Sequence, residues 1–186
     1  MNVTDPTVVL GAALRPPVRA TGRFMLRHPA HWLALGFGTG LSPWAPGTAG
    51  TLWAWVAYLV LQRWLGDLGW ALLLGGGLLI GWWACTVTAR TLNVPDPSVI
   101  VWDEVLAFWL VLWIAAPTTL AGQLTAFALF RFFDAAKPGP VAWADALFKR
   151  RSAQQPIGWA QGWGVLFDDL VAALCTLLVI ALARWW

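Results

Sequence analysis

The chain reads Ser98-Val-Ile-Val-Trp-Asp-Glu-Val-Leu-Ala-Phe-Trp-Leu-Val-Leu-Trp-Ile114, an apolar segment that contains two adjacent carboxylates. Asp103 and Glu104 do not help such a segment to pack, because a carboxylate at the centre of a bilayer helix costs about 2.5–3.5 kcal/mol on insertion scales. Acidic residues in this setting usually face the interior of a helix bundle or a polar cavity. Asp103 and Glu104 are therefore candidate functional residues, and three other polar clusters of the chain are their candidate partners.

The composition places the chain among integral membrane proteins. Its 186 residues are 59% hydrophobic and only 11% charged, with a mean hydropathy of +0.65, which excludes an ordinary soluble domain. The sixteen Trp residues suit a protein with many rings at the membrane interface. Cys85 and Cys175 both lie in apolar runs, so we expect small core residues and no disulfide. We also expect no nucleic-acid partner.

Apolar runs predict an all-α, polytopic membrane bundle of about five transmembrane helices. The clearest run, Leu68 to Ala89, is free of charged residues over its whole length. A Gly/Pro-rich loop at 36–51 precedes the first span, and its position before a helix is typical of an anion site at a helix N-terminus. Ser98 is a plausible cap for the helix that carries the acidic pair. The predicted helices cover 52–64, 68–89, 98–116, 119–136 and an apolar stretch that ends near Trp185.

The N-terminal segment, residues 1–31, is predicted as a separate basic surface segment, and residues 32–186 as one membrane-embedded catalytic domain. Arg15, Arg19, Arg23 and Arg27 are spaced by four, so they would line one face if the segment is helical after Pro17. This favours an amphipathic helix on an anionic leaflet. A solvated leader with positive-inside charge is an equally good interpretation.

The basic residues predict the orientation in the membrane. With five spans and the N-terminus inside, only Arg63 and Arg184 lie outside, and the other ten basic residues lie on the cytoplasmic side. The same topology places four polar clusters at the cytoplasmic ends of helices. Residues of a single site between the helices would have to lie at such positions. These clusters are the Gly/Thr-rich loop, Asp103-Glu104, Arg131-Asp134-Lys137 and Asp168-Asp169.

The residue types in these clusters indicate metal-assisted phosphoryl chemistry. Five converging carboxylates would repel one another unless a cation or protons neutralised them, and hard oxygen ligands select Mg²⁺, Mn²⁺ or Ca²⁺. Arg131 and Lys137 supply the positive charges that an anionic substrate such as a phosphate needs. Both His residues, His28 and His31, lie near the N-terminus and are expected at the interface, so a phosphohistidine mechanism is not expected. What remains is attack on phosphorus by water or by a carboxylate.

Simpler interpretations stay open for each cluster. Asp134 is also explained by a structural ion pair with Arg131 or Lys137, and Asp96 by a turn. Asp168-Asp169 at a helix N-terminus would complement the helix dipole. A small cation or proton transporter with buried carboxylates is the rival function, and a non-catalytic lipid-binding scaffold is a third.

Four ordered motifs resemble those of the phosphatidylglycerophosphatase A family of bacterial membrane lipid phosphatases. The resemblance covers most of residues 36–185 and is specific because the motifs occur together. It implies Mg²⁺-dependent hydrolysis of phosphatidylglycerophosphate to phosphatidylglycerol and phosphate at the cytoplasmic face of the inner membrane. Ala107 and Ala173 stand where the family often has Gly. The motifs are residues 40–52 (GLSPWAPGTAGTL), 101–105 (VWDEV), 130–140 (FRFFDAAKPGP) and 168–172 (DDLVA).

The residue roles that we hypothesise go beyond the resemblance. Asp103, Glu104, Asp168 and Asp169 would hold the metal and activate the nucleophile, with Asp134 as a further ligand or base. The terminal phosphate would be bound by cationic and hydroxyl side chains, namely Arg131, Lys137, Thr48, Thr51 and Ser42. The oligomeric state is not predicted.

Overall fold

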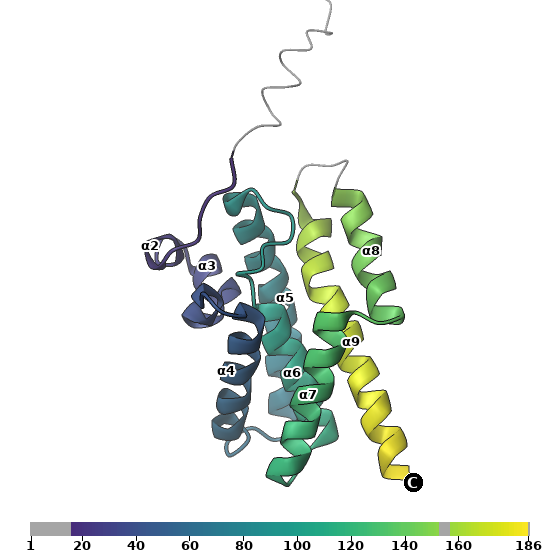
Figure 1. Cartoon of the computed structure of the whole chain (residues 1–186). Coiled ribbons are helices and arrows are strands. Elements are labelled where there is room, and N and C mark those ends of the chain that lie inside the picture. Colours follow the sequence, from purple (N-terminus) through teal and green to yellow (C-terminus); the bar gives the residue numbers. More distant parts are fainter. Residues whose placement is uncertain (1–15, 153–156, 186) are drawn as a thin grey trace, which may run out of the picture.

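The chain is all-helical in a computed structural model that describes residues 16–152 and 157–185 (Figure 1). This confirms the all-α part of the predicted fold class, since no strand occurs in those two ranges. The elements, in chain order, are α2 (Gly22–Met25), α3 (Pro29–Ala34), the 3₁₀ helix η1 (Gly36–Leu41), α4 (Pro46–Leu61), α5 (Asp67–Leu92), α6 (Trp102–Ala115), α7 (Leu120–Ala136), α8 (Pro140–Ser152) and α9 (Trp159–Trp185).

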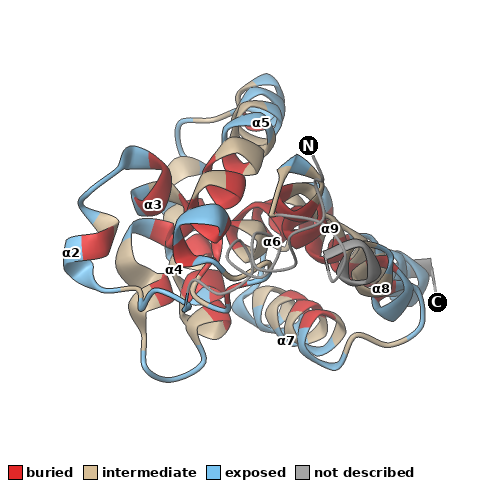
Figure 2. Ribbon diagram, turned by 90° about the horizontal axis from the view of Figure 1, so that it is seen from above, coloured by how far each residue is buried: buried red, intermediate tan, exposed pale blue. Residues whose placement is uncertain are grey.

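Helix α6 forms the centre of the bundle. It packs against α4, α5, α7 and α9, which surround it when the molecule is seen from above (Figure 2). Val105, Phe108, Val111 and Leu112 are fully buried, so most of α6 beyond its acidic first turn is apolar and enclosed by neighbouring helices. Helix α8 packs along the outer side of α9, whereas α3 packs on α5.

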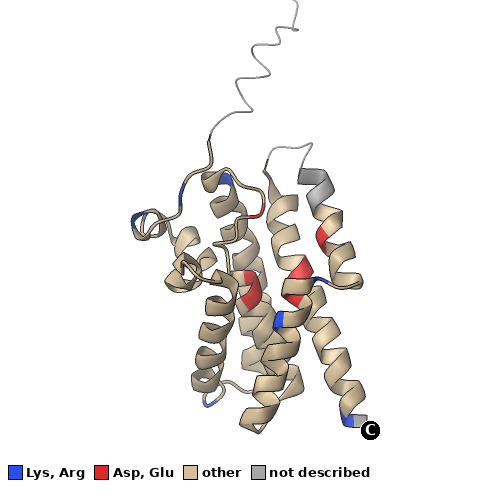
Figure 3. Ribbon diagram, viewed as in Figure 1, with Lys and Arg blue, Asp and Glu red and all other residues tan. Residues whose placement is uncertain are grey.

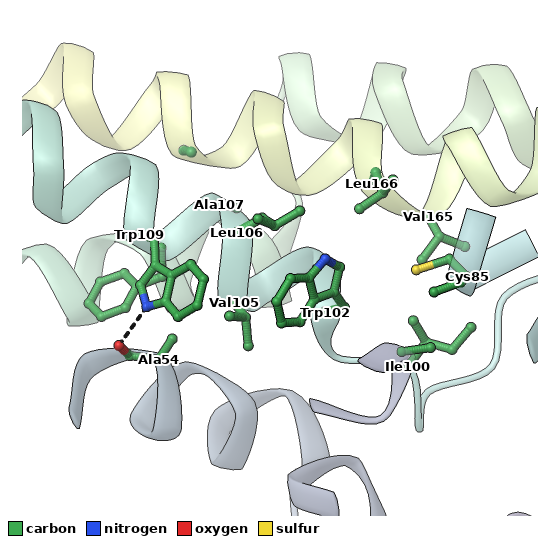
Figure 4. Close-up of a cluster of buried hydrophobic side chains, with 14 of the residues drawn as sticks. Ala54, Cys85, Ile100, Trp102, Val105, Leu106, Ala107, Trp109, Val165 and Leu166 are labelled. Carbon is green, nitrogen blue, oxygen red and sulfur yellow. Dashed lines mark hydrogen bonds between the residues drawn. The ribbon is translucent and has the colours of Figure 1, made fainter. Parts of the chain in front are cut away.

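Polar atoms of the core aromatic residues hydrogen-bond to backbone carbonyls of neighbouring helices. Trp109 Nε1 of α6 donates to the Ala54 carbonyl of α4 over 2.8 Å (Figure 4). Tyr58 of α4 donates to the Leu112 carbonyl over 3.1 Å, and Trp102 Nε1 donates to the Gly77 carbonyl of α5 over 3.0 Å. A buried aromatic ring thus adds apolar area while its polar atom is satisfied.

Two helices are long and apolar enough to cross a membrane, α5 and α9. Their most apolar windows have mean hydropathies of 1.6 and 2.4. Leu72 of α5, Val56 of α4 and Leu178 of α9 are more than half exposed, which suits contact with lipid. Helices α4, α6 and α7 have 16, 14 and 17 residues, at or below the length that usually spans a bilayer. The protein is therefore membrane-associated, and the number of about five spans stays a prediction.

Glycine allows close approaches near the beginnings of α6 and α9. At Gly36, which has a φ of +52°, a Cβ atom would lie 2.6 Å from Val101 Cγ2, so the loop packs directly on the residue before α6. The Val101 N–H also donates to the Ala34 carbonyl over 2.9 Å. A Cβ atom at Gly162 of α9 would lie 2.9 Å from the Cα of Thr86 in α5. These contacts hold the beginning of α6 beside the Gly/Pro-rich loop.

Several predicted helix boundaries are wrong. Helix α4 begins at Pro46 rather than Leu52, and Ala45 before it adopts a left-handed φ of 44°. Ser98 does not cap α6, because the N-cap is Val101. Helix α8 occupies part of a stretch that was predicted only as polar. Helix α9 begins at Trp159, so Asp168 and Asp169 lie inside it, and the interpretation that they complement a helix N-terminus is wrong.

In the described part of the N-terminal segment, residues 16–31, the predicted amphipathic helix is represented by the short α2. Arg23 lies within α2, whereas Arg19 precedes it and Arg27 follows it, and Arg15 lies outside the described residues. His31 is not interfacial but buried, because its Nδ1 lies 2.9 Å from Thr88 Oγ1 and its ring stacks on Phe24. His28 caps α3 by accepting a hydrogen bond from the Ala30 N–H. His31 therefore connects α3 with α2 and α5, and His28 caps the beginning of α3.

Candidate active site

A cavity of about 240 Å³ lies where α4 and α6 begin and α7 ends, beside the middle of α9. Figure 3 shows acidic segments of α6 and α9 near this level. Six carboxyl groups and two cationic side chains line the cavity, so a strong negative charge gathers there if all of them are ionised. The charged lining residues are Asp96, Asp103, Glu104, Arg131, Asp134, Lys137, Asp168 and Asp169.

Three of these residues form a compact cluster, which we call the three-carboxylate cluster: Asp103, Glu104 and Asp169. One carboxylate oxygen from each lies within 4.8 Å of the other two. Asp103 and Glu104 come from the first turn of α6, and Asp169 comes from α9. Asp103 Oδ1, Glu104 Oε2 and Asp169 Oδ2 are buried and have no hydrogen-bond partner. Buried carboxylate oxygens without partners are costly, and their donor chemistry fits a hard divalent cation.

Asp134 and Arg131 stand beside this cluster as an ion pair on one face of α7. Arg131 Nη1 contacts Asp134 Oδ2 and lies 3.9 Å from Glu104 Oε1. Asp134 is buried and lies next to Asp169. The structural ion pair considered as an alternative for Asp134 is therefore present, and it places Arg131 between Asp134 and Glu104.

Asp168 belongs to a different group from Asp169. Successive residues of an α-helix project about 100° apart, so the adjacent acids of α9 face different neighbours. Lys137 Nζ donates to Asp168 Oδ2 over 2.5 Å and to Asp145 Oδ1 of α8 over 2.6 Å. We call Lys137, Asp145 and Asp168 the lysine group.

The carboxylates of the lysine group keep Lys137 charged. Burial by itself lowers the pKa of the Lys137 ammonium, but the charges of Asp168 and Asp145 and their hydrogen bonds outweigh this effect. The pKa of Lys137 is therefore raised above its ordinary value. Because Lys137 also lines the cavity, it presents a permanent positive charge at the edge of the site.

Asp145 is the functional candidate that sequence reasoning missed. It lies on α8, which was not predicted as a helix. Only the residues around Asp145 carried a sequence pattern that indicates a helix. Val141, Ala144 and Phe148 recur at helical spacing around it, and Val141 and Ala144 are fully buried. That pattern would have predicted a helix with Asp145 next to its apolar face.

The beginning of α4 closes the cavity on another side. A Cβ atom at Gly47 would collide with Glu104 Oε1 and lie 3.2 Å from Arg131 Nη1, so a larger residue here would displace the Glu104 carboxylate. The N-cap residue, Ala45, provides no side-chain hydrogen bond to the first turn. Backbone N–H groups at this end of α4 therefore have no side-chain cap and lie close to the carboxylates.

The three predicted hydroxyl residues do not line the cavity. Thr51 is buried and donates to the Gly47 carbonyl of its own helix over 2.8 Å. Ser42 donates to the Trp44 carbonyl over 2.8 Å within the loop. Thr48 is half-buried in the first turn of α4. Asp96 lies in the loop between α5 and α6, as predicted, but it borders the cavity as well.

Comparison with known proteins connects this arrangement with a family. The family model described as Phosphatidylglycerophosphatase A matches residues 32–184. A Haemophilus influenzae protein named Phosphatidylglycerophosphatase A is 35% identical over 166 residues, covering 88% of this chain and 94% of its own length. The Escherichia coli K12 protein of the same name is 36% identical over 156 residues, covering 83% of each. No solved structure matches the chain.

Proposed function

Because the chain belongs to the phosphatidylglycerophosphatase A family, we propose that it hydrolyses phosphatidylglycerophosphate with a divalent cation bound at the three-carboxylate cluster. Family membership makes it a lipid phosphatase, a phosphoric monoester hydrolase that acts in phosphatidylglycerol synthesis. The products are phosphatidylglycerol and inorganic phosphate. The transporter and the scaffold considered from the sequence are set aside for this reason.

The proposed cation is supported by three buried carboxylate oxygens without hydrogen-bond partners, on Asp103, Glu104 and Asp169. A phosphate monoester is itself negatively charged at neutral pH, so it would be repelled by a cavity with six carboxyl groups and two cations. A cation must therefore bind in the cavity together with the substrate or before it. Mg²⁺ is our candidate, because it prefers carboxylate oxygens and binds together with substrate phosphates.

Asp103, Glu104 and Asp169 would hold the ion, and Asp168 would not, because its carboxylate is engaged by Lys137. When bound, Mg²⁺ supplies Lewis acidity to a phosphoryl oxygen and lowers the pKa of a coordinated water. The protein's own residues bind and orient the substrate. Arg131 offers a planar fork for the phosphate, and Lys137 offers a point charge.

The first turn of α4 adds backbone donors to these cations. Its N–H groups carry partial positive charge from the helix dipole and lack a side-chain cap. Gly47 brings them against Glu104 and Arg131. Asp134 is placed beside Arg131 and Asp169, where it can accept a proton from an attacking water.

We further propose a multi-pass protein of the bacterial inner membrane, with the site at the cytoplasmic face. The cavity lies at the end of the bundle that carries α2, α3 and the loop after α5, where Arg19, Arg23, Arg27 and Arg90 are located. Arg63 follows α4 at the opposite end, and Arg184 terminates α9 there. This distribution follows the positive-inside rule.

Phosphate release from phosphatidylglycerophosphate by the purified, detergent-solubilised chain tests the proposal. We expect EDTA to reduce release to background, and an excess of Mg²⁺ to restore it. The control is Asp67→Asn, since Asp67 begins α5 at the far end of the bundle and only accepts a hydrogen bond from Trp113. Full activity in EDTA would contradict the proposed metal dependence. No phosphate release in the presence of Mg²⁺ would contradict the proposed hydrolysis.

A further inference from the structure

The end of α7 directs Lys137 away from its own helix. Lys137 is the C-cap residue and adopts a left-handed φ of 46°. Pro138 cannot continue the helix, and Gly139 also has a positive φ, of 53°, before α8 begins at Pro140. A non-glycine residue adopts this conformation only where its surroundings impose it. The turn therefore returns the chain along α9 and brings α8 next to the Lys137 side chain.

Lys137 then meets one carboxylate from each of two helices. Its ammonium group has three N–H donors, and two of them are used by Asp145 of α8 and Asp168 of α9. Lys137 lines the main cavity, whereas Asp145 does not. Two acceptors on different helices define the direction of the ammonium group, which a single carboxylate on a flexible side chain would not do.

Helix α8 is seated firmly enough to act as a support. Phe148, three residues after Asp145, packs edge-to-face on Phe167 of α9, with the ring centroids 5.6 Å apart. A Cβ atom at Gly164 would lie 2.5 Å from Phe148 Cβ, so glycine is needed for this close contact. Asp145 is therefore held on the side of α8 that faces α9.

We propose that Asp145 is a positioning residue, which acts with Asp168 to hold the Lys137 ammonium so that its third N–H faces the substrate phosphate in the cavity. Asp145 acts through Lys137 and does not touch substrate. This inference rests on the proposed function, because it assigns the phosphate of the lipid substrate to Lys137. It also gives α8 a role in substrate binding.

The test is steady-state kinetics of phosphate release by purified Asp145→Asn, at constant saturating Mg²⁺. We expect KM to rise about tenfold and kcat to change less than about threefold, because the ammonium keeps its charge but loses its direction. Asp145→Glu keeps the carboxylate on a longer side chain and should raise KM only about threefold. An unchanged KM in both variants overturns the proposal. If the Asn variant does not fold, the Glu variant decides in the same way.

A double variant separates positioning from a structural effect of α8. Lys137→Ala alone should raise KM about tenfold or more, and adding Asp145→Asn to it should change KM by less than about twofold. If Asp145→Asn has its full effect in the absence of Lys137, it acts by another route and the proposal fails. Phe148→Ala is the matched control, which should lower the melting temperature more than Asp145→Asn does. An inactive wild-type protein would instead refute the proposed function itself.

Discussion

The adjacent acidic residues of α9 have different neighbours at this site. Asp169 joins Asp103 and Glu104, while Asp168, one position earlier on α9, pairs with Lys137. On α9 the two side chains project about 100° apart and reach different neighbours, whereas Asp103 and Glu104 of α6, which are also adjacent, both reach the three-carboxylate cluster. Residue type therefore identifies the acids of the site, and packing between helices decides which neighbours each of them has.

Substituting Asp103 by Asn should separate activity from stability. Removing one of three converging carboxylates should lower kcat at least about a hundredfold, as changes around metal ligands typically do. Because the substitution also removes one of three buried acidic groups that lie close together, the melting temperature in EDTA should stay equal or rise. Phosphate release and thermal unfolding in detergent measure the two effects. Retained turnover would exclude Asp103 from the site, and Asp67→Asn should change neither quantity.

The sequence predicted the members of the site better than their grouping. The acidic pair of α6 stood out because charge is rare in an apolar segment, and all five predicted carboxyl groups border one cavity. It could not show that Asp168 accepts a hydrogen bond from Lys137, because that contact depends on how the end of α7 packs beside α9. The hydroxyl groups of Thr51 and Ser42 were chosen from residue type alone, and local backbone carbonyls accept their hydrogen bonds.

At the scale of helices, close packing of α9 on α5 sets the position of the acids on α9. Gly162 lies against the backbone of Thr86, so α9 approaches α5 six residues before Asp168. The predicted extent of α5 was nearly correct, because a long uncharged run leaves little choice. The predicted start of α9 was wrong, because the segment that contains Trp159, Gln161 and Gly162 is not a typical apolar run. Interhelical contact, which the sequence does not display, makes them helical.

Substituting Gly162 by Ala should destabilise the protein. The added Cβ atom would meet the Cα and Cβ atoms of Thr86, both at 2.9 Å, and backbone cannot move aside as a side-chain end can. We expect a loss of about 1–3 kcal/mol, the usual range for overpacking. Thermal unfolding in detergent measures it. Gly75→Ala on α5 is the control, because nothing lies within 4 Å of its added Cβ, and it should be neutral or slightly stabilising. Equal melting temperatures for the two variants would contradict this account.

At the scale of the whole molecule, the ends of the bundle differ in chemistry. One end carries the cavity, α2, α3 and most described basic residues, and the other carries short connections such as the one between α6 and α7. The predicted orientation uses this asymmetry. Helices α5 and α9 are long enough to span a bilayer. The other spans were predicted from hydropathy, and packing inside the bundle explains the apolar character of those helices equally well.

Cysteine labelling in intact cells should reveal this orientation. In a background with Cys85 and Cys175 replaced by Ala, Cys at position 63 or 118 should react with a membrane-impermeant maleimide added outside. Cys at position 23 or 91 should react only after permeabilisation. All four positions are exposed, so accessibility of the side chain does not limit the reaction. Labelling of all four from the same side would refute five spans with the N-terminus inside.

The unequal lengths of the central helices have a consequence for the surrounding lipid. Helix α6, with 14 residues, rises about 21 Å, whereas the hydrocarbon core of a bilayer is about 30 Å thick. In the proposed membrane orientation, the acids on its first turn would lie deeper than the phosphates of an undisturbed leaflet, so the leaflet would have to thin near them or the substrate would have to move inward. From this proposed orientation we expect turnover to depend on acyl-chain length and to be higher in thinner membranes.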